Sequence, residues 1–215
     1  MIRKLKASGL TLLALFAISA VAATAAQADP VFKASNSSGG LSGNGSASES
    51  FTTEAGSVVC EESSFTGTYA SAEAATQRMH PTYGKCKAFG FVSATVATGK
   101  CDYVFDPYQK VSAGNYKAKV AVDCAEGAIT ITASTCTAKV EDVPGNQELS
   151  YVALENSGGD VKADPETTGI TYNVTNDGFL CPFNGTGVKT DGKYTSTGTV
   201  AISAEGSTTI EVAGE

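Results

Sequence analysis

Residues 116–122 read Tyr-Lys-Ala-Lys-Val-Ala-Val, and every second side chain from Tyr116 onward is apolar. Successive side chains of a β-strand point to opposite faces of a sheet, so this alternation predicts a strand with one buried face. The earlier segment 101–106 fits an antiparallel partner in which Tyr103 faces Val122. The chain is therefore expected to be built around paired, half-buried strands.

The same pattern recurs along the chain, and short turns rich in glycine separate the runs. Glu54-Ala55-Gly56 and Thr98-Gly99-Lys100 are two such turns, and Glu205-Gly206 is expected to close a C-terminal hairpin. Many short strands with regular turn signals predict an all-β fold, either an antiparallel β-sandwich or a partly open barrel. The further predicted strands lie at residues 51–53, 57–60, 89–92, 94–96, 103–105, 129–132, 135–140, 149–154, 170–174, 199–202 and 208–212.

Three segments depart from this pattern. Ser71–Arg78 is predicted to form a short helix or a loop turn. Asn36–Ser50 is rich in serine and glycine, which favours a flexible segment or a long surface loop. Val143-Pro144-Gly145-Asn146 is the best candidate boundary, but we expect one domain over 29–215, with sub-lobes 29–143 and 146–215 as the alternative division.

The N-terminus has the features of an export signal. A basic start, Met1–Lys6, precedes an apolar stretch over Leu10–Ile18, and Ala26-Gln27-Ala28 matches the small-x-small cleavage pattern. We therefore expect residues 1–28 to be a signal peptide, and a mature protein that is secreted or held in the cell envelope. The apolar stretch is short for a membrane span of about 20 residues, so no membrane insertion is expected after cleavage.

The expected mature chain is acidic. The leader holds three of the 15 basic residues and none of the 22 acidic ones, so cleavage leaves a net charge of 12 − 22 = −10. Such a surface repels nucleic acid and anionic membranes, which excludes both as expected partners.

Six cysteines follow the leader, at Cys60, Cys86, Cys101, Cys124, Cys136 and Cys181. No C-x-x-C motif is present and His80 is the only histidine, so a zinc site is not expected. Three disulfides are predicted instead, which is typical of a protein in an oxidising compartment.

Six cysteines allow 15 connectivities. Local pairing predicts Cys86–Cys101 and Cys124–Cys136, which leaves Cys60–Cys181. The hairpin register described above instead predicts Cys101–Cys124 and then Cys86–Cys136. We favour local pairing, because a direct bridge between neighbouring strands often strains the bond. Either way, five cysteines precede residue 143 and one follows residue 146, so one bridge must join the two segments.

Three stretches resemble a group of uncharacterised exported bacterial proteins with six cysteines. They are Tyr-Gly-Lys-Cys-Lys-Ala-Phe-Gly-Phe at residues 83–91, with Cys-Asp-Tyr-Val-Phe at 101–105, and Phe-Thr-Thr-x-Ala-Gly-x-Val-x-Cys at 51–60. The matching motifs are turns, core positions and cysteines. The resemblance implies export from a cell of the high-GC Gram-positive type and supplies no catalytic residues.

Catalytic groups are scarce. His80 is alone and no Gly-x-Ser-x-Gly motif accompanies it, so we interpret it as a loop histidine. Asp102 and Asp106 share a strand face, but four residues place their backbones about 13 Å apart. That exceeds the roughly 5–9.5 Å between the two carboxyl groups of a glycosidase. No catalytic residue and no cofactor-binding residue is predicted.

Two other groups of residues allow both a purely structural and a functional interpretation. Asp160, Asp164 and Glu166 in one loop, with Asn176-Asp177-Gly178 in another, suit calcium, but an ordinary acidic turn is the favoured interpretation and no metal or other cofactor is expected. Phe89 and Phe91 share a strand face and are interpreted as core rather than as an exposed recognition patch.

These observations favour a non-enzymatic binding or structural module outside the cytoplasm, with an extracellular protein or glycan as its partner. One alternative is a secreted hydrolase that uses two carboxylates from distant strands. The other is an inhibitor that presents loops held by disulfides.

Overall fold

The computed structural model describes residues 29–141, 149–176, 181–183, 185–206 and 208–214. The expected signal peptide and the expected boundary at Val143–Asn146 lie outside these residues. The described part contains 16 strands and no helix, so it contains no helix that could cross a membrane. The strands are β1 (Val31–Ala34), β2 (Gly39–Gly45), β3 (Glu49–Thr52), β4 (Ser57–Tyr69), β5 (Glu73–Ala74), β6 (Gln77–Ala88), β7 (Val92–Ala97), β8 (Cys101–Ser112), β9 (Asn115–Cys124), β10 (Ala128–Ala133), β11 (Cys136–Glu141), β12 (Leu149–Ser157), β13 (Asp160–Asn176), β14 (Gly187–Ser196), β15 (Val200–Ala204) and β16 (Ile210–Ala213).

The main sheet closes on itself twice, and all of its pairings are antiparallel. The first ring runs β13-β14-β3-β4-β6-β7-β10-β11 and returns to β13. The second ring runs β13-β12-β9-β8-β6-β4-β2-β15 and also returns to β13. The predicted all-β class is confirmed.

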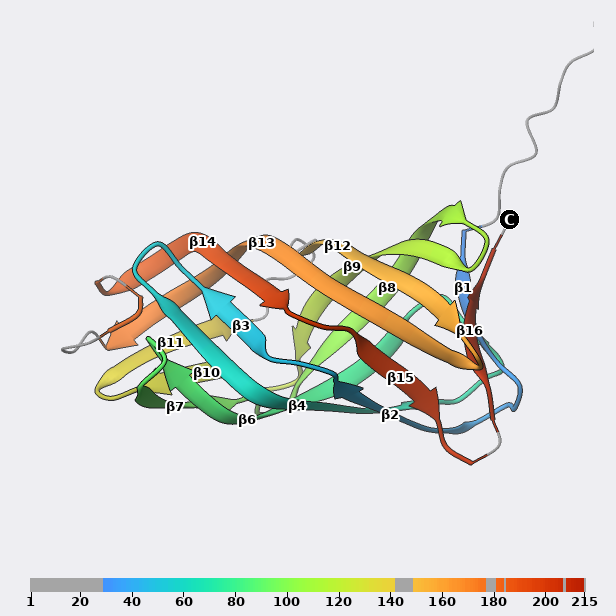
Figure 1. Ribbon diagram of the computed structural model, residues 1–215, viewed down its shortest axis with the longest axis horizontal. Coiled ribbons are helices and arrows are strands. Elements are labelled where there is room, and N and C mark those ends of the chain that lie inside the picture. The colour runs from blue at the N-terminus through green and yellow to red at the C-terminus, as the bar shows by residue number, and fades with distance from the viewer. Residues whose placement is uncertain (1–28, 142–148, 177–180, 184, 207, 215) are drawn as a thin grey trace, which may run out of the picture.

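Three long strands, β4, β6 and β13, belong to both rings. In β4, residues 57–60 pair with β3 of the first ring, and residues 64–69 pair with β2 of the second. The two rings therefore follow each other along the long axis of the molecule, which is elongated (Figure 1). We call the level at which these strands change partners the junction. A separate three-stranded sheet, β16-β1-β5, lies at the end of the second ring (Figure 1).

The alternating sequence of β9 is the pattern that the structure follows most directly. Tyr116, Ala118, Val120 and Val122 are all buried. Its hairpin with β8 has the predicted register, with Tyr103 opposite Val122. The hairpin of β3 and β4 around residues 54–56 is also confirmed.

Each disulfide joins two cysteines that follow each other in the sequence, and the first two bridges join register partners of the sheet. The bridges are Cys60–Cys86, Cys101–Cys124 and Cys136–Cys181, so the favoured local pairing was wrong in all three bridges. Cys60 and Cys86 are register partners because β4 and β6 run antiparallel. The competing hairpin prediction was right for Cys101–Cys124 and wrong for Cys86–Cys136. One bridge does join the two segments of the chain, and its first cysteine is Cys136 instead of Cys60.

The serine- and glycine-rich segment 36–50 was wrongly predicted as a loop, since it contains β2 and the start of β3. Small residues are needed there because β2 packs closely on its neighbours. A Cβ atom on Gly43 would lie 3.2 Å from the carbonyl oxygen of Ala201 and 3.4 Å from Cβ of Phe65. Low side-chain volume in this segment is therefore a packing requirement of the closed sheet.

Two other local predictions were wrong for the same non-local reason. Residues 71–78 form no helix: they contain β5 and the start of β6, and β5 pairs with β1. The expected hairpin around Glu205-Gly206 does not form. Both edges of β15 are already paired, with β2 and β13, so β16 pairs with β1 instead.

Gly67 in β4 tests how closely the second ring is packed. A Cβ atom there would lie against the backbone carbonyl oxygen of Arg78, which cannot move without disturbing β6. We expect Gly67→Ala to lower the free energy of unfolding by about 2 kcal/mol, as overpacking of a core typically does. Urea denaturation with the disulfides intact measures this.

Gly40→Ala is the matched control in β2. Its added methyl group meets only the carboxyl end of Glu205, an exposed and flexible side chain. We expect a change within about 0.5 kcal/mol. Equal losses in the two variants would contradict the close approach of β4 and β6.

Candidate binding cavity

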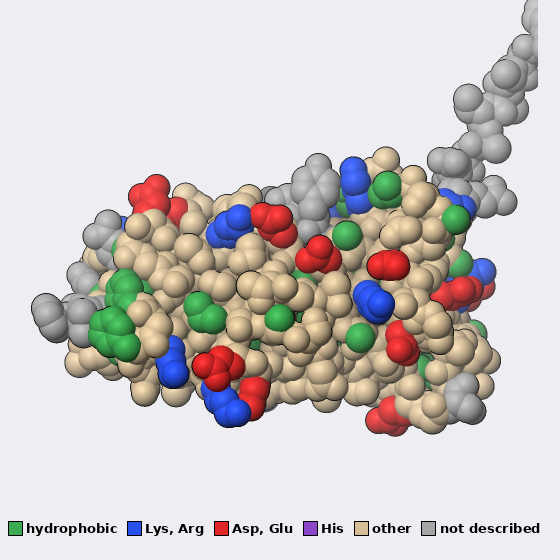
Figure 2. Space-filling model, in the orientation of Figure 1, with side chains coloured by type: hydrophobic (Ala, Val, Ile, Leu, Met, Phe, Trp, Pro, Cys, Tyr) green, Lys and Arg blue, Asp and Glu red, His purple; other side chains and the backbone are tan. Residues whose placement is uncertain are grey.

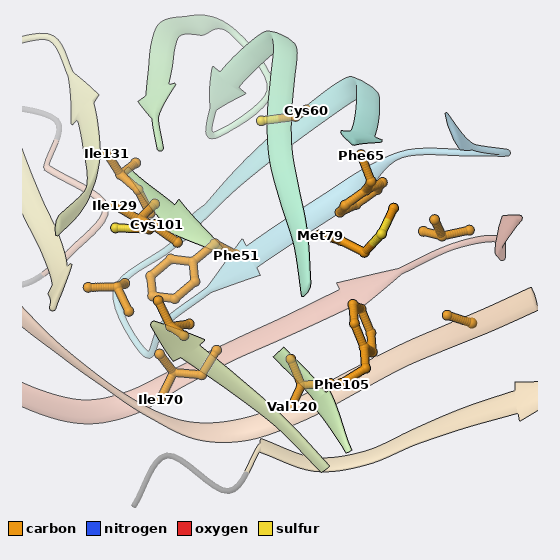
Figure 3. Close-up of a cluster of buried hydrophobic side chains, with 14 of the residues drawn as sticks. Phe51, Cys60, Phe65, Met79, Cys101, Phe105, Val120, Ile129, Ile131 and Ile170 are labelled. Atoms are coloured by element: carbon orange, nitrogen blue, oxygen red, sulfur yellow. The ribbon is translucent and has the colours of Figure 1, made fainter. Parts of the chain in front are cut away.

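A cavity of about 80 Å³ lies within the closed sheet, and side chains from both rings line it. Figure 3 shows part of its apolar lining, with the labelled side chains Phe51, Ile129 and Ile170 on one side and Phe65, Met79 and Phe105 on the other. The complete lining consists of Glu49, Phe51, Val58, Cys60, Phe65, Met79, Tyr83, Val96, Tyr103, Phe105, Val120, Val122, Ile129, Ile131, Val140, Ala163, Pro165, Thr167, Ile170, Tyr194, Val200 and Ile202.

Polar atoms enter this apolar interior in one cluster. The Tyr83 hydroxyl lies 2.8 Å from that of Tyr103 and 3.1 Å from that of Tyr194. Close by, the Ser63 hydroxyl donates to Oε1 of Glu49 over 3.2 Å. We call Glu49, Ser63, Tyr83, Tyr103 and Tyr194 the polar cluster.

The polar cluster lies at the junction of the two rings. Ser63 falls between the part of β4 that pairs with β3 and the part that pairs with β2. Tyr83, its register partner, falls between the parts of β6 that pair with β8 and with β7. Apolar walls therefore extend from the polar cluster into both rings.

Strand parity places Glu49 inside. In β3 the side chains of Glu49 and Phe51 point to the same face, and both are buried, Glu49 to 2% exposure. Phe51 packs edge to face on Tyr172, with ring centroids 5.5 Å apart. Because Phe51 packs in the core, Glu49, two residues earlier on the same face of β3, also points into the cavity.

Glu49 is incompletely hydrogen-bonded. Its Oε2 atom has no hydrogen-bond partner in the described residues, and neither does Oγ1 of Thr167, which is 3% exposed. Burial in apolar surroundings raises the pKa of Glu49, and the neighbouring hydroxyl groups of Tyr194, Ser63 and Ser196 oppose this shift. An unpaired buried polar atom costs about 1–3 kcal/mol, so two of them beside one cavity need an explanation.

The three tyrosines are weaker acids than tyrosine in water. Burial raises the pKa of Tyr103 to about 12. Burial also raises the pKa values of Tyr83 and Tyr194. Tyr103 and Tyr194 add to the shift of Tyr83, whereas Tyr103 and Glu49 add to that of Tyr194 and its hydrogen bond with Tyr83 opposes it. The three hydroxyl groups therefore stay neutral across the physiological range and act as hydrogen-bond donors and acceptors.

His80 belongs to a different cluster, on the outside of the second ring. His80 was predicted to lie in a loop, and this was wrong, because it lies in strand β6. Its Nδ1 lies 3.2 Å from Oδ1 of Asp102, and its Nε2 lies 3.4 Å from Oγ1 of Thr98. Arg78 forms ion pairs with the same Asp102 and with Asp123. The order hydroxyl, imidazole, carboxylate matches the geometry of a nucleophile, its base and an orienting acid.

The other acidic residues singled out from the sequence do not converge. Asp106 lies in β8 opposite Lys119, away from the network of Asp102. Asp160, Asp164 and Glu166 lie along strand β13 and not in one loop, because residues 160–165 pair with β12. The described residues include no group of three potential metal-ligating side chains, and Asp177 and Gly178 lie outside them.

Phe89 and Phe91 were wrongly predicted as core. The chain turns at Phe89-Gly90, which have φ angles of 51° and 79°, and Phe91 donates its N–H to the Ala88 carbonyl. Phe89 is 36% exposed and Phe91 is 70% exposed, with their ring centroids 6.5 Å apart. Figure 2 shows a group of hydrophobic side chains at the end of the molecule formed by the first ring.

Comparison of the chain with family models, with curated proteins and with solved structures finds no match. The candidate site therefore has to be argued from its own geometry.

Glu49 was not among the residues predicted from the sequence to be functional. Glu49 was placed in the expected loop at residues 36–50, although its parity with Phe51 was visible. The polar cluster draws on five strands, and only Tyr103 had been singled out, for its place in the hairpin with β9.

The raised pKa of Glu49 predicts a pH-dependent effect of Glu49→Gln. The native protein holds the Glu49 proton more tightly than the unfolded chain, so wild-type stability falls as pH rises from about 4.5 through the native pKa. The glutamine variant lacks this loss. We expect its stability relative to wild type to grow between pH 4 and pH 8, by about 1.4 kcal/mol for each unit of pKa shift.

Urea denaturation at both pH values measures this difference, and parallel pH profiles would contradict it. Glu166→Gln is a control of opposite sign. Its ion pair with Lys193 lowers the pKa of Glu166, so its contribution is present at neutral pH and is lost as pH falls.

Thr167→Val tests the unpaired hydroxyl. It removes an unsatisfied buried oxygen with little change of shape, so we expect stability to stay equal or to rise by up to about 1 kcal/mol. Thr53→Val is the matched control, because the buried Thr53 hydroxyl donates to the Pro182 carbonyl over 2.6 Å. We expect that variant to lose about 1–2 kcal/mol. Equal losses in thermal unfolding would refute an unpaired Thr167.

Proposed function

We propose that the protein is a non-enzymatic binding protein that acts outside the cytoplasm and holds a small, mainly apolar molecule inside its closed sheet. The observation that carries this proposal is the apolar cavity with an unpartnered oxygen of Glu49 beside it. Ligand sites are typically apolar hollows with a few convergent polar groups and a group of perturbed pKa.

The size of the cavity limits the ligand. An engineered cavity of about 150 Å³ takes up benzene, which corresponds to about 25 Å³ per carbon atom. The cavity of about 80 Å³ then admits three or four carbon atoms without movement of its walls. A longer chain requires side chains such as Met79 to move, and methionine adapts to such changes more readily than branched residues do.

Three disulfides indicate an oxidising compartment. The N-terminal signal pattern supports secretion or retention in the cell envelope as part of the proposal. An extracellular protein or glycan as a further partner stays a prediction, and the exposed pair Phe89 and Phe91 is a surface on which contact would be expected.

The cavity favours binding over hydrolysis by two carboxylates. Glu49 is the only acid among the described residues that line it, and a glycosidase needs a second carboxyl group. We therefore expect no turnover inside the cavity.

A titration with normal alkanes from propane to hexane tests the proposal. Backbone amide shifts of the ¹⁵N-labelled mature protein report binding residue by residue. We expect shifts at lining residues, and an affinity that rises about fourfold for each buried methylene group until about four carbons are accommodated. Shifts confined to the surface would overturn the proposal.

Ala163→Leu is the cavity-filling variant, because Ala163 is 1% exposed and lines the cavity. In this variant we expect the affinity to stop rising at a shorter alkane than in wild type. Ala121→Leu, at an exposed position of β9, is the matched control and should bind as wild type does. Should Ala163→Leu fail to fold, Ile129→Phe fills the cavity from the first ring.

A second candidate function, ester hydrolysis, is favoured only by the arrangement of Thr98, His80 and Asp102. Thr98 is 8% exposed and Arg78 shares the Asp102 carboxylate, which disfavours a reactive nucleophile. We expect equal, background-level turnover of p-nitrophenyl acetate in wild type, Thr98→Val and the exposed control Thr95→Val. A loss confined to Thr98→Val would favour hydrolysis instead.

A further inference from the structure

The hydrogen-bond inventory of the polar cluster leaves one carboxyl oxygen of Glu49 without a partner among the described residues. Tyr83 is engaged by both Tyr103 and Tyr194, and Oε1 of Glu49 accepts from Ser63. Oε2 of Glu49 has no such partner in the described residues, and Glu49 lines the cavity with 2% of its surface exposed. A ligand atom beside Oε2 would complete the cluster.

The charges around Glu49 determine what that atom can be. The groups that face it are hydroxyls: Ser63 from β4, Ser196 and Tyr194 from β14, with Tyr83 from β6 and Tyr103 from β8 next to them. No lysine, arginine or histidine is among the residues that line the cavity. An anionic ligand would therefore be buried without a counter-charge, which costs several kcal/mol.

A cationic ligand would have to pair with an ionised Glu49. Both charges would then leave water for an apolar cavity, and the desolvation penalty can exceed their attraction. A neutral pair avoids this penalty. Burial favours the protonated form of Glu49, and a protonated carboxyl group is a donor as well as an acceptor.

We infer that the ligand presents an uncharged oxygen acceptor, such as a carbonyl, ether or hydroxyl oxygen, to the protonated carboxyl group of Glu49 at the junction of the two rings. This inference rests on the proposed function, since it names the head group of the molecule that the cavity holds. Ser63 fixes Oε1 as an acceptor and so leaves Oε2–H as the donor.

Four probes of nearly equal shape separate the alternatives: acetone, isobutane, isopropylamine and acetate. Acetone presents a hydrogen-bond acceptor and isobutane presents no polar atom. Isopropylamine presents a cation and acetate an anion. We expect acetone and isobutane to shift amides of lining residues, and isopropylamine and acetate to leave them unchanged at the same concentration. The measurement uses the labelled mature protein with its disulfides intact, at pH 4.5 and pH 9, and acetate is compared at pH 9 alone, because most of it is protonated and neutral at pH 4.5.

The ratio of acetone affinity to isobutane affinity isolates the hydrogen bond, because both probes share the apolar contribution. We expect this ratio to fall about tenfold in Glu49→Leu, which has no donor. Glu49→Gln keeps a neutral donor and should keep the ratio. In wild type the ratio should fall as pH rises and Glu49 ionises, whereas in Glu49→Gln it should not change with pH.

Each outcome bears on one of the two proposals. No lining shift with any probe, isobutane included, overturns the binding function itself. Binding of both neutral probes with a ratio insensitive to Glu49→Leu and to pH keeps the cavity and overturns the role of Glu49. Preferential binding of isopropylamine or acetate overturns the uncharged head group. If Glu49→Leu does not fold, the pH dependence of wild type against Glu49→Gln decides alone.

Discussion

The structure depends on three strands that are each shared by two closed rings. β4, β6 and β13 change partners along their length, so one continuous set of backbone hydrogen bonds holds both rings together. Closure removes the exposed edges that an open sheet would leave. It also brings polar side chains from several strands together at the junction, where Glu49 and Ser63 are buried and the three tyrosines are partly buried.

The sequence predicted the parts of this fold that depend on local pattern. Alternation in residues 116–122, the hairpin register with Tyr103 and the turn after Thr53 were all visible, because each needs only period two and a turn. Strand order was not visible. β2 and β5 pair with strands distant in the sequence, and their local composition, serine and glycine or helix formers, indicated a loop and a helix instead. β16 was predicted as a strand, but as the partner of β15 and not of β1.

The disulfides illustrate the same limit. Closeness in sequence allows both the favoured pairing and the observed one, in which consecutive cysteines are joined, so strand register decides which residues meet. Cys60 and Cys86 meet only because β4 and β6 are neighbours, a pairing that no turn between them reveals. The hairpin register, the one piece of tertiary geometry that the sequence does contain, identified Cys101–Cys124 correctly.

The candidate site follows from these constraints rather than from a motif. Two residues suffice to predict that Glu49 is buried, once Phe51 is assigned to the inner face of the same strand. Its partners cannot be predicted this way, because Ser63, Tyr83 and Tyr194 come from strands whose adjacency is set by ring closure. A closed, long-range sheet can hold an incompletely paired carboxyl group in place because moving it would disrupt pairings in both rings. The sheet therefore holds the unpaired oxygen in place, and under the proposed function this oxygen would distinguish one small apolar molecule from another.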